Sequence, residues 1–108
     1  MTWLDEIAYF GGGAVLTNAI PHLVRGLTGQ SFQSPFASPP GAGLSSATVN
    51  VLWAFANLSV AYLLLCRVGS FSIRSVDVLA LAAGALVIAL FSARHFGQFH
   101  GGNKASSS

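Results

Sequence analysis

The chain is organised around the stretch Thr17-Asn18-Ala19-Ile20-Pro21-His22, which ends its first long apolar run. Asn18 and His22 are four residues apart, so on a helix they share one face. Pro21 lies between them, lacks a backbone donor and crowds the carbonyl group of Thr17. Because Asn, Pro and His rarely occur together within one turn of an apolar helix, we expect this stretch to border a polar site.

The composition is that of a membrane protein. Of the 108 residues, 53% are hydrophobic and 7% are charged, and the mean hydropathy is +0.64. An ordinary soluble domain is about 25% charged, so a chain this short with so few charges would not cover its own surface in water. The net charge of +2 comes from scattered residues that form no basic patch, which argues against binding to nucleic acid. The single cysteine, Cys66, excludes a disulfide within the chain.

Three apolar runs are long enough to cross a bilayer, at residues 7–24, 47–66 and 77–93. The first run reaches about 27 Å as a helix, close to the thickness of the hydrocarbon core. It follows Asp5 and Glu6, whereas a cleavable signal peptide would begin with basic residues, so we expect this run to be retained. The sequence predicts an all-α fold with a single transmembrane domain, a bundle of three transmembrane helices.

The segments between and after these runs have a different composition. Residues 26–46 form a long loop rich in Pro, Gly and Ser, which cannot cross lipid as a helix. A loop of this length is either functional or disordered, and Phe32, Phe36 and Leu44 argue against full disorder. Residues 97–108 are polar and are expected to form a flexible tail.

Small residues and amides follow a regular spacing in the second run. The residues that recur every three or four positions are Ala47, Asn50, Ala54, Asn57 and Ala61. Such a seam is typical of helix–helix contacts in membranes. Residues 11–13 are all glycine and make the first run thin, which lets another helix approach closely.

Three crossings place the end of the first run, the loop, the start of the second run and the end of the third run on one side of the membrane. Counting residues from this side places His22 and Asn50 at the same depth, about one helical turn in. We therefore predict that His22 borders a small polar pocket that is closed by Asn50 and roofed by residues 32–40. By the same count, Asn18 lies between Asn50 and Asn57.

The third run brings Ser92 and His95 to about the same depth in the membrane as His22 and Asn50. The candidate residues for a polar pocket or for helix contacts are Asn18, Pro21, His22, Asn50, Asn57, Ser92 and His95.

Several interpretations of these polar residues stay open. The asparagines either bind a polar ligand or join helices by hydrogen bonds that are worth about 0.6–2 kcal/mol each in a membrane. His22 either lines a pocket, extends to the membrane surface beside a helix kink, or ligates a metal or haem together with His95 or His100. No cysteine or carboxylate accompanies these histidines, so we assign no metal ligands and expect no cofactor. No nucleophile is paired with an oriented base, so we assign no catalytic residues and expect no enzymatic activity.

Three segments of the chain resemble a group of small, uncharacterised bacterial integral-membrane proteins. These segments are Asn18-Ala19-Ile20-Pro21-His22, Ser34-Pro35-Phe36 and Asn50-Val51-Leu52-Trp53. The resemblance covers roughly residues 8–66 and implies a multi-span membrane protein, without any assigned activity.

We therefore expect a multi-pass protein of the bacterial inner membrane that serves as a non-enzymatic subunit or scaffold. Its small-residue seams suggest that it forms a homo-oligomer or binds a larger membrane-protein partner within the lipid bilayer. The alternative is a small carrier or binder of a lipid-like or polar-headed ligand at the level of His22 and Asn50. A haem- or metal-binding membrane protein is the least favoured alternative.

Overall fold

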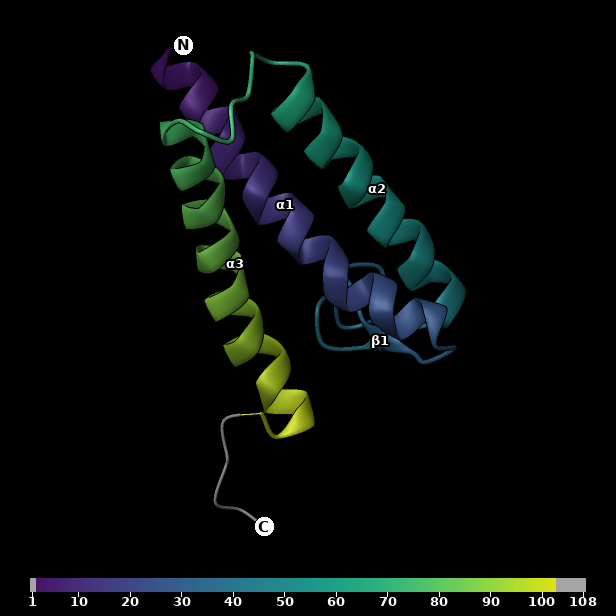
Figure 1. Cartoon of the computed structure of the whole chain (residues 1–108). Helices are drawn as coiled ribbons and strands as arrows, with labels where there is room; N and C mark the ends of the chain where they lie inside the picture. The colour runs from purple at the N-terminus through teal and green to yellow at the C-terminus, as the bar shows by residue number, and fades with distance from the viewer. Residues whose placement is uncertain (1, 103–108) are drawn as a thin grey trace.

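The computed structural model describes residues 2–102 (Figure 1). Its elements are α1 (Trp3–Leu27), β1 (Phe32–Gln33), β2 (Leu44–Ser45), α2 (Ala47–Cys66) and α3 (Val76–His100). All three helices are long and apolar enough to cross a membrane. The predicted all-α fold with three transmembrane helices is confirmed, and the chain has the architecture of a multi-pass membrane protein.

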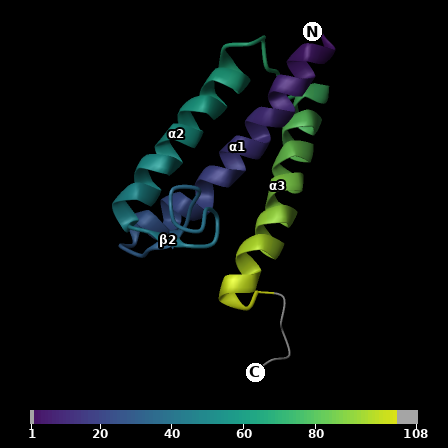
Figure 2. The same cartoon turned by 180° about the vertical axis from the view of Figure 1, so that it is seen from behind.

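The long helix α1 lies between α2 and α3, as both views of the chain show (Figures 1 and 2). α2 and α3 each pack along α1 and barely touch one another. The first helix, which carries Asn18 and His22, therefore meets side chains from both of the other helices. This central place makes α1 the scaffold on which the candidate site is built.

Two of the helices are longer than the apolar runs from which they are predicted. α1 begins after a capping box in which Thr2 accepts from the backbone of Asp5, and it continues through Pro21 to Leu27. α2 covers the predicted residues 47–66. α3 continues to His100 and ends at Gly101, whose φ of 71° is the left-handed conformation that closes many helices.

The prediction of a flexible tail over residues 97–108 is wrong for residues 97–100. Residues 97–100 belong to α3, and residues 103–108 lie outside the described part of the chain. The physical reason is that His95 and His100 bond to the loop between α1 and α2, so the polar end of α3 has partners. A polar sequence that finds partners stays helical, whereas one that finds none frays.

Glycines allow α1 and α3 to touch through their backbones. A Cβ atom on Gly13 of α1 would overlap the carbonyl oxygen of Leu81, and one on Gly84 of α3 would overlap that of Phe10. On the other side of α1, a Cβ on Gly12 would meet the side chain of Leu65 from α2. The predicted thin half of the first helix is confirmed, and it brings both neighbouring helices close.

The amide seam of α2 faces the protein. The buried residues of this helix are Asn50, Ala54, Asn57 and Ala61, four of the five residues that the spacing predicts. Because most of these side chains are small, α1 and α2 can approach each other closely along this seam.

The loop between α1 and α2 is a folded cap. β1 and β2 pair antiparallel, with Phe32 opposite Ser45. The backbone amide of Gly41 donates to the carbonyl of Ser34 at 2.8 Å, and that of Gly43 donates to Pro39 at the same distance. The cap covers the C-terminal end of α1 and the start of α2 (Figure 2). It forms the roof of the site described next.

Candidate ligand-binding site

Asn50 joins α2 to the cap and to α1. Its side-chain nitrogen donates to the carbonyl oxygens of Phe32, Ser45 and Ser46 at 3.0–3.2 Å. Carbonyl oxygens only accept hydrogen bonds, so these three contacts decide which end of the amide carries nitrogen. The side-chain oxygen of Asn50 then faces the Nδ1 atom of His22 at 2.7 Å. The structure thus brings His22 and Asn50 together as the depth count predicts.

His22 is buried on α1, with only 2% of its surface exposed. Because the oxygen of Asn50 must accept, the Nδ1 atom of His22 carries the hydrogen. The rings of Phe32, Trp53 and Phe96 surround the imidazole edge-on, at centroid distances of 5.4–6.5 Å. Its Nε2 atom has no hydrogen-bond partner among the described residues. The Nε2 nitrogen of this firmly held imidazole is thus free to bond to a ligand.

A second amide pair lies deeper in the membrane. Asn18 of α1 donates to the side-chain oxygen of Asn57 of α2 at 3.1 Å, and Asn57 donates to the carbonyl of Trp53 at 2.8 Å. Asn57 is only 7% exposed. These contacts favour the interpretation that Asn57 joins helices, whereas Asn18 also reaches the cavity described next.

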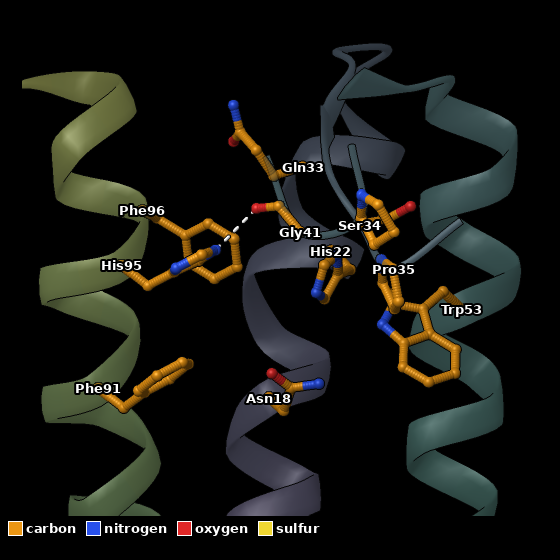
Figure 3. Close-up of a pocket in the computed structure, with 11 residues that line it drawn as sticks. Asn18, His22, Gln33, Ser34, Pro35, Gly41, Trp53, Phe91, His95 and Phe96 are labelled. Atoms are coloured by element: carbon orange, nitrogen blue, oxygen red, sulfur yellow. Dashed lines mark hydrogen bonds between the residues drawn. The ribbon is translucent and has the colours of Figure 1, made fainter. Parts of the chain in front are cut away.

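A cavity of about 370 Å³ opens beside His22, where α1, α2, α3 and the cap meet (Figure 3). It is lined by Asn18, His22, Gln33, Ser34, Pro35, Pro40, Gly41, Trp53, Phe91, His95 and Phe96. The polar groups lie on α1 and the cap, while α2 and α3 contribute mainly aromatic rings. No lining residue is Asp, Glu, Lys or Arg. The predicted loop roofs this cavity, whereas Asn50, which is predicted to close it, is not among the lining residues and instead bonds to His22.

His95 forms the α3 wall of this cavity. Its Nε2 atom lies 2.7 Å from the carbonyl oxygen of Gly41, so it carries a hydrogen and donates it (Figure 3). The ring also stacks on Phe91, one helical turn earlier on α3. His95 thus ties α3 to the cap.

Five residues further along α3, His100 makes a second hydrogen bond to the cap. Its Nε2 atom contacts the side-chain oxygen of Gln33 at 3.0 Å, and its ring stacks on Phe32. His95, which lines the cavity, and His100, which lies outside it, therefore both hold α3 to the cap.

Ser92 and Pro21 lie away from this cavity. Both line a separate hollow of about 350 Å³ between α1 and α3, together with Thr17. No side chain of the described residues donates to the Thr17 carbonyl that Pro21 leaves without its backbone partner. Ser92 thus shares the predicted level in the membrane but not the pocket.

Metal binding finds little support in this geometry. No three His, Cys, Asp or Glu side chains within residues 2–102 come together as metal ligands. His22 and His95 line one cavity, but the Nε2 atom of His95 is already bonded to Gly41. His100 contacts Gln33 instead.

Sequence reasoning misses the aromatic part of the cavity wall. Phe91 and Phe96 of α3 and Trp53 of α2 line it. Phe91 and Trp53 sit in apolar runs where lipid contact is the default expectation, and Phe96 follows the third run. A usable signal is the four-residue spacing between Phe91 and His95, which puts them on one helix face.

A second polar cluster, also missed, lies at the opposite end of the helices. Asp77 at the start of α3 is 2% exposed and accepts from the backbone of Ser72 at 2.9 Å. Its carboxyl group lies within hydrogen-bonding reach of Glu6 on α1. The other Asp77 oxygen and both Glu6 oxygens are buried and have no donor among the described residues. Glu6 lies near the start of α1 and Asp77 near the start of α3. Because two membrane crossings separate these starts, counting crossings places both acids on the same side of the membrane.

No protein family, curated protein or solved structure matches this chain. Its class is therefore defined by its own architecture: a small multi-pass α-helical membrane protein. It carries a buried histidine that lines a cavity beneath a folded cap.

Proposed function

We propose that this chain is a protein of the bacterial inner membrane that binds a small lipid-like ligand, with the ligand's polar headgroup at His22. One observation carries the proposal: the Nε2 atom of a firmly held, buried imidazole borders a cavity of about 370 Å³ and has no partner among the described residues. Small-molecule sites are commonly concave and mostly apolar, with a few polar groups that fix orientation. The assignment to the bacterial inner membrane is the expectation drawn from the sequence, where three segments resemble small bacterial integral-membrane proteins.

The apolar part of such a ligand has a place to lie. A hollow of about 260 Å³ is lined by Val15, Trp53, Ala56, Asn57 and Val60. It shares Trp53 with the His22 cavity, and Asn57 is bonded to Asn18 in the wall of that cavity. Trp53 therefore borders both spaces, one near the cap and the other about one to two turns deeper along α2. An amphipathic molecule fits this order, with its head under the cap and its tail along α1 and α2.

Trp53 lines both spaces and can report on binding. The other tryptophan, Trp3, is exposed at the far end of α1 and can be replaced by phenylalanine. The protein with Trp3→Phe, in nanodiscs, is titrated with lipids that carry bromine on the tail, which quenches tryptophan fluorescence on contact. We expect saturable quenching of Trp53 that unlabelled lipid reverses and that His22→Asn weakens.

The matched control is Ser59→Ala on α2, because Ser59 is exposed and its hydroxyl contacts only the Phe55 carbonyl. This variant should bind like the parent protein. Quenching that rises linearly with bromolipid in every variant reflects bulk lipid, and it would contradict the proposal.

A second function, a subunit or scaffold of a membrane assembly, is favoured by the arrangement of the helices. Among the helices, α3 packs on α1, whereas α2 and α3 barely touch each other. Helices with one packed side gain contacts when a second copy of the chain covers another side. Native mass spectrometry after extraction in mild detergent tests this proposal. A fixed number of copies supports a homo-oligomer, and a single chain under all conditions contradicts it.

A further inference from the structure

We infer that the headgroup bound at His22 is a neutral hydroxyl, of an alcohol or a phenol, which donates its hydrogen to the Nε2 atom. This inference rests on the proposed function and adds the chemical class of the ligand. It follows from the hydrogen-bonding capacity of the cavity wall, taken one group at a time.

The orientation of the Asn50 amide fixes the tautomer of His22. If the side-chain amide of Asn50 were turned over, its oxygen would face the carbonyl oxygens of Phe32, Ser45 and Ser46. Three acceptors would then meet a fourth, so this orientation is excluded on physical grounds. The oxygen of Asn50 therefore accepts from the Nδ1 atom of His22, and in the neutral imidazole the Nε2 atom holds a lone pair. Toward the cavity His22 is an acceptor.

The wall of the cavity offers no charged side chain to pair with a charged headgroup. No side chain that lines it is an acid or a base other than the two histidines. The nearest basic residue on α1, Arg25, is occupied elsewhere, since it contacts Gln30 and lies over the ring of Phe32. A carboxylate or phosphate headgroup would lose its hydration there without a counter-charge, and so would an ammonium group. The chemistry of the wall therefore selects a neutral headgroup.

The donors and acceptors that remain unpaired in the cavity wall also restrict the headgroup. The Nε2 hydrogen of His95 is already donated to the Gly41 carbonyl. Asn18 donates to Asn57, and its own side-chain oxygen accepts from no described residue. The wall therefore offers acceptors at His22 and Asn18. It also offers the N–H groups of the Gln33 amide and the Trp53 indole, which donate to no described residue. These groups suit a ligand that both donates and accepts a hydrogen bond. A hydroxyl does so without charge, and the rings of Trp53 and Phe96 pack against the carbon skeleton next to it.

The test uses three bromine-labelled ligands with the same tail: a long-chain alcohol, its methyl ether and the corresponding carboxylic acid. Quenching of Trp53 is measured in the protein with Trp3→Phe, in nanodiscs of zwitterionic phospholipid. We expect the alcohol to bind about tenfold more tightly than the ether, which cannot donate. The acid should bind more weakly than the alcohol.

The discriminating variant is His22→Asn. The asparagine amide can occupy the place of the Nδ1 atom and keep the bond to Asn50, while it lacks the Nε2 atom. We expect this variant to lose the preference for alcohol over ether and to retain the weaker binding of the tail. Ser59→Ala is again the matched control and should keep the full preference.

The possible outcomes separate this inference from the proposed function. If the alcohol and the ether bind equally and saturably, the ligand class is wrong and the proposed function stands. Tighter binding of the acid also overturns the ligand class. If none of the three binds saturably, the proposed function fails together with the inference. A measurement independent of any variant is the nitrogen NMR spectrum of His22, where a hydrogen on Nε2 in the unliganded protein would overturn the inference.

Discussion

The imidazole of His22 on α1 donates its Nδ1 hydrogen to the side-chain oxygen of Asn50 on α2 across 2.7 Å, and both side chains are buried. The nitrogen of the same amide holds backbone carbonyls at Phe32 in the cap and at Ser45 and Ser46 before α2. One side chain thus connects two helices and the cap. The position of the ligand-facing nitrogen of His22 depends on this connection.

Asn50→Leu should therefore destabilise the cap. Leucine has a similar size but leaves the Nδ1 atom of His22 and the Phe32 carbonyl without partners, at about 1–3 kcal/mol for each buried group. We expect a lower thermal unfolding temperature in detergent and faster proteolysis within residues 28–46. Ser59→Ala should change neither measurement. An Asn50→Leu protein with a parent-like cleavage rate would contradict this account of the cap.

Asn57→Leu tests the deeper amide pair by a double-mutant cycle. The single variants Asn57→Leu and Asn18→Leu each remove the bond between these side chains, and the double variant removes it only once. Interhelical hydrogen bonds in membranes average about 0.6 kcal/mol and reach about 1.7 kcal/mol. We expect a coupling energy in this range for the unfolding free energy in micelles. A coupling energy of zero would mean that the pair does not hold α1 to α2.

The contact between α1 and α2 is predictable from the sequence because helix geometry is regular. The spacing of small and amide residues identifies the buried face of α2, and counting residues from the loop pairs His22 with Asn50. Both arguments need only the rise and the period of a helix. They require no knowledge of the loop.

The cap and the end of α3 are not predictable in this way. His95 meets Gly41 across 54 residues of sequence, and His100 meets Gln33 across 67. A polar helix end looks the same in sequence whether or not it finds partners. The pairing of Glu6 with Asp77 is missed for a different reason, since both look like ordinary acids at helix starts.

The close contact of α1 and α3 predicts a marked difference between glycines at this contact and a glycine outside it. Gly13→Ala and Gly84→Ala should lower the unfolding temperature, because a methyl group would overlap a backbone carbonyl of the facing helix. Gly11→Ala is the matched control, since its Cβ would meet only the Leu64 side chain at 3.5 Å. Alanine also favours a helix over glycine, so Gly11→Ala should be neutral or slightly stabilising. Equal effects at residues 11, 13 and 84 would rule out the backbone contact.

The three crossings predict the sidedness of single cysteines. In a Cys66→Ser background, Ser38→Cys in the cap and Gln98→Cys near the end of α3 should react with an impermeant thiol reagent from one side. Ile73→Cys, which replaces a residue that is 73% exposed in the turn before α3, should react only from the other side. Labelling is measured in intact and in permeabilised membranes. Reaction of residues 38 and 73 from the same side would contradict the three-span topology.

The carboxyl pair at the other end of the helices leads to a stabilising substitution. Glu6 and Asp77 face one another, and three of their four oxygens are buried without a donor among the described residues. Buried acceptors without donors are costly, and two facing carboxylates also repel each other. Glu6→Gln removes one charge and supplies an amide hydrogen to Asp77, so the thermal unfolding temperature in detergent should rise. Glu6→Leu is the matched control, because it removes the charge and supplies no donor, and it should give a smaller gain than Glu6→Gln. A Glu6→Gln protein that unfolds at or below the temperature of the parent protein would contradict the claim that these two carboxyl groups face each other and lack a donor.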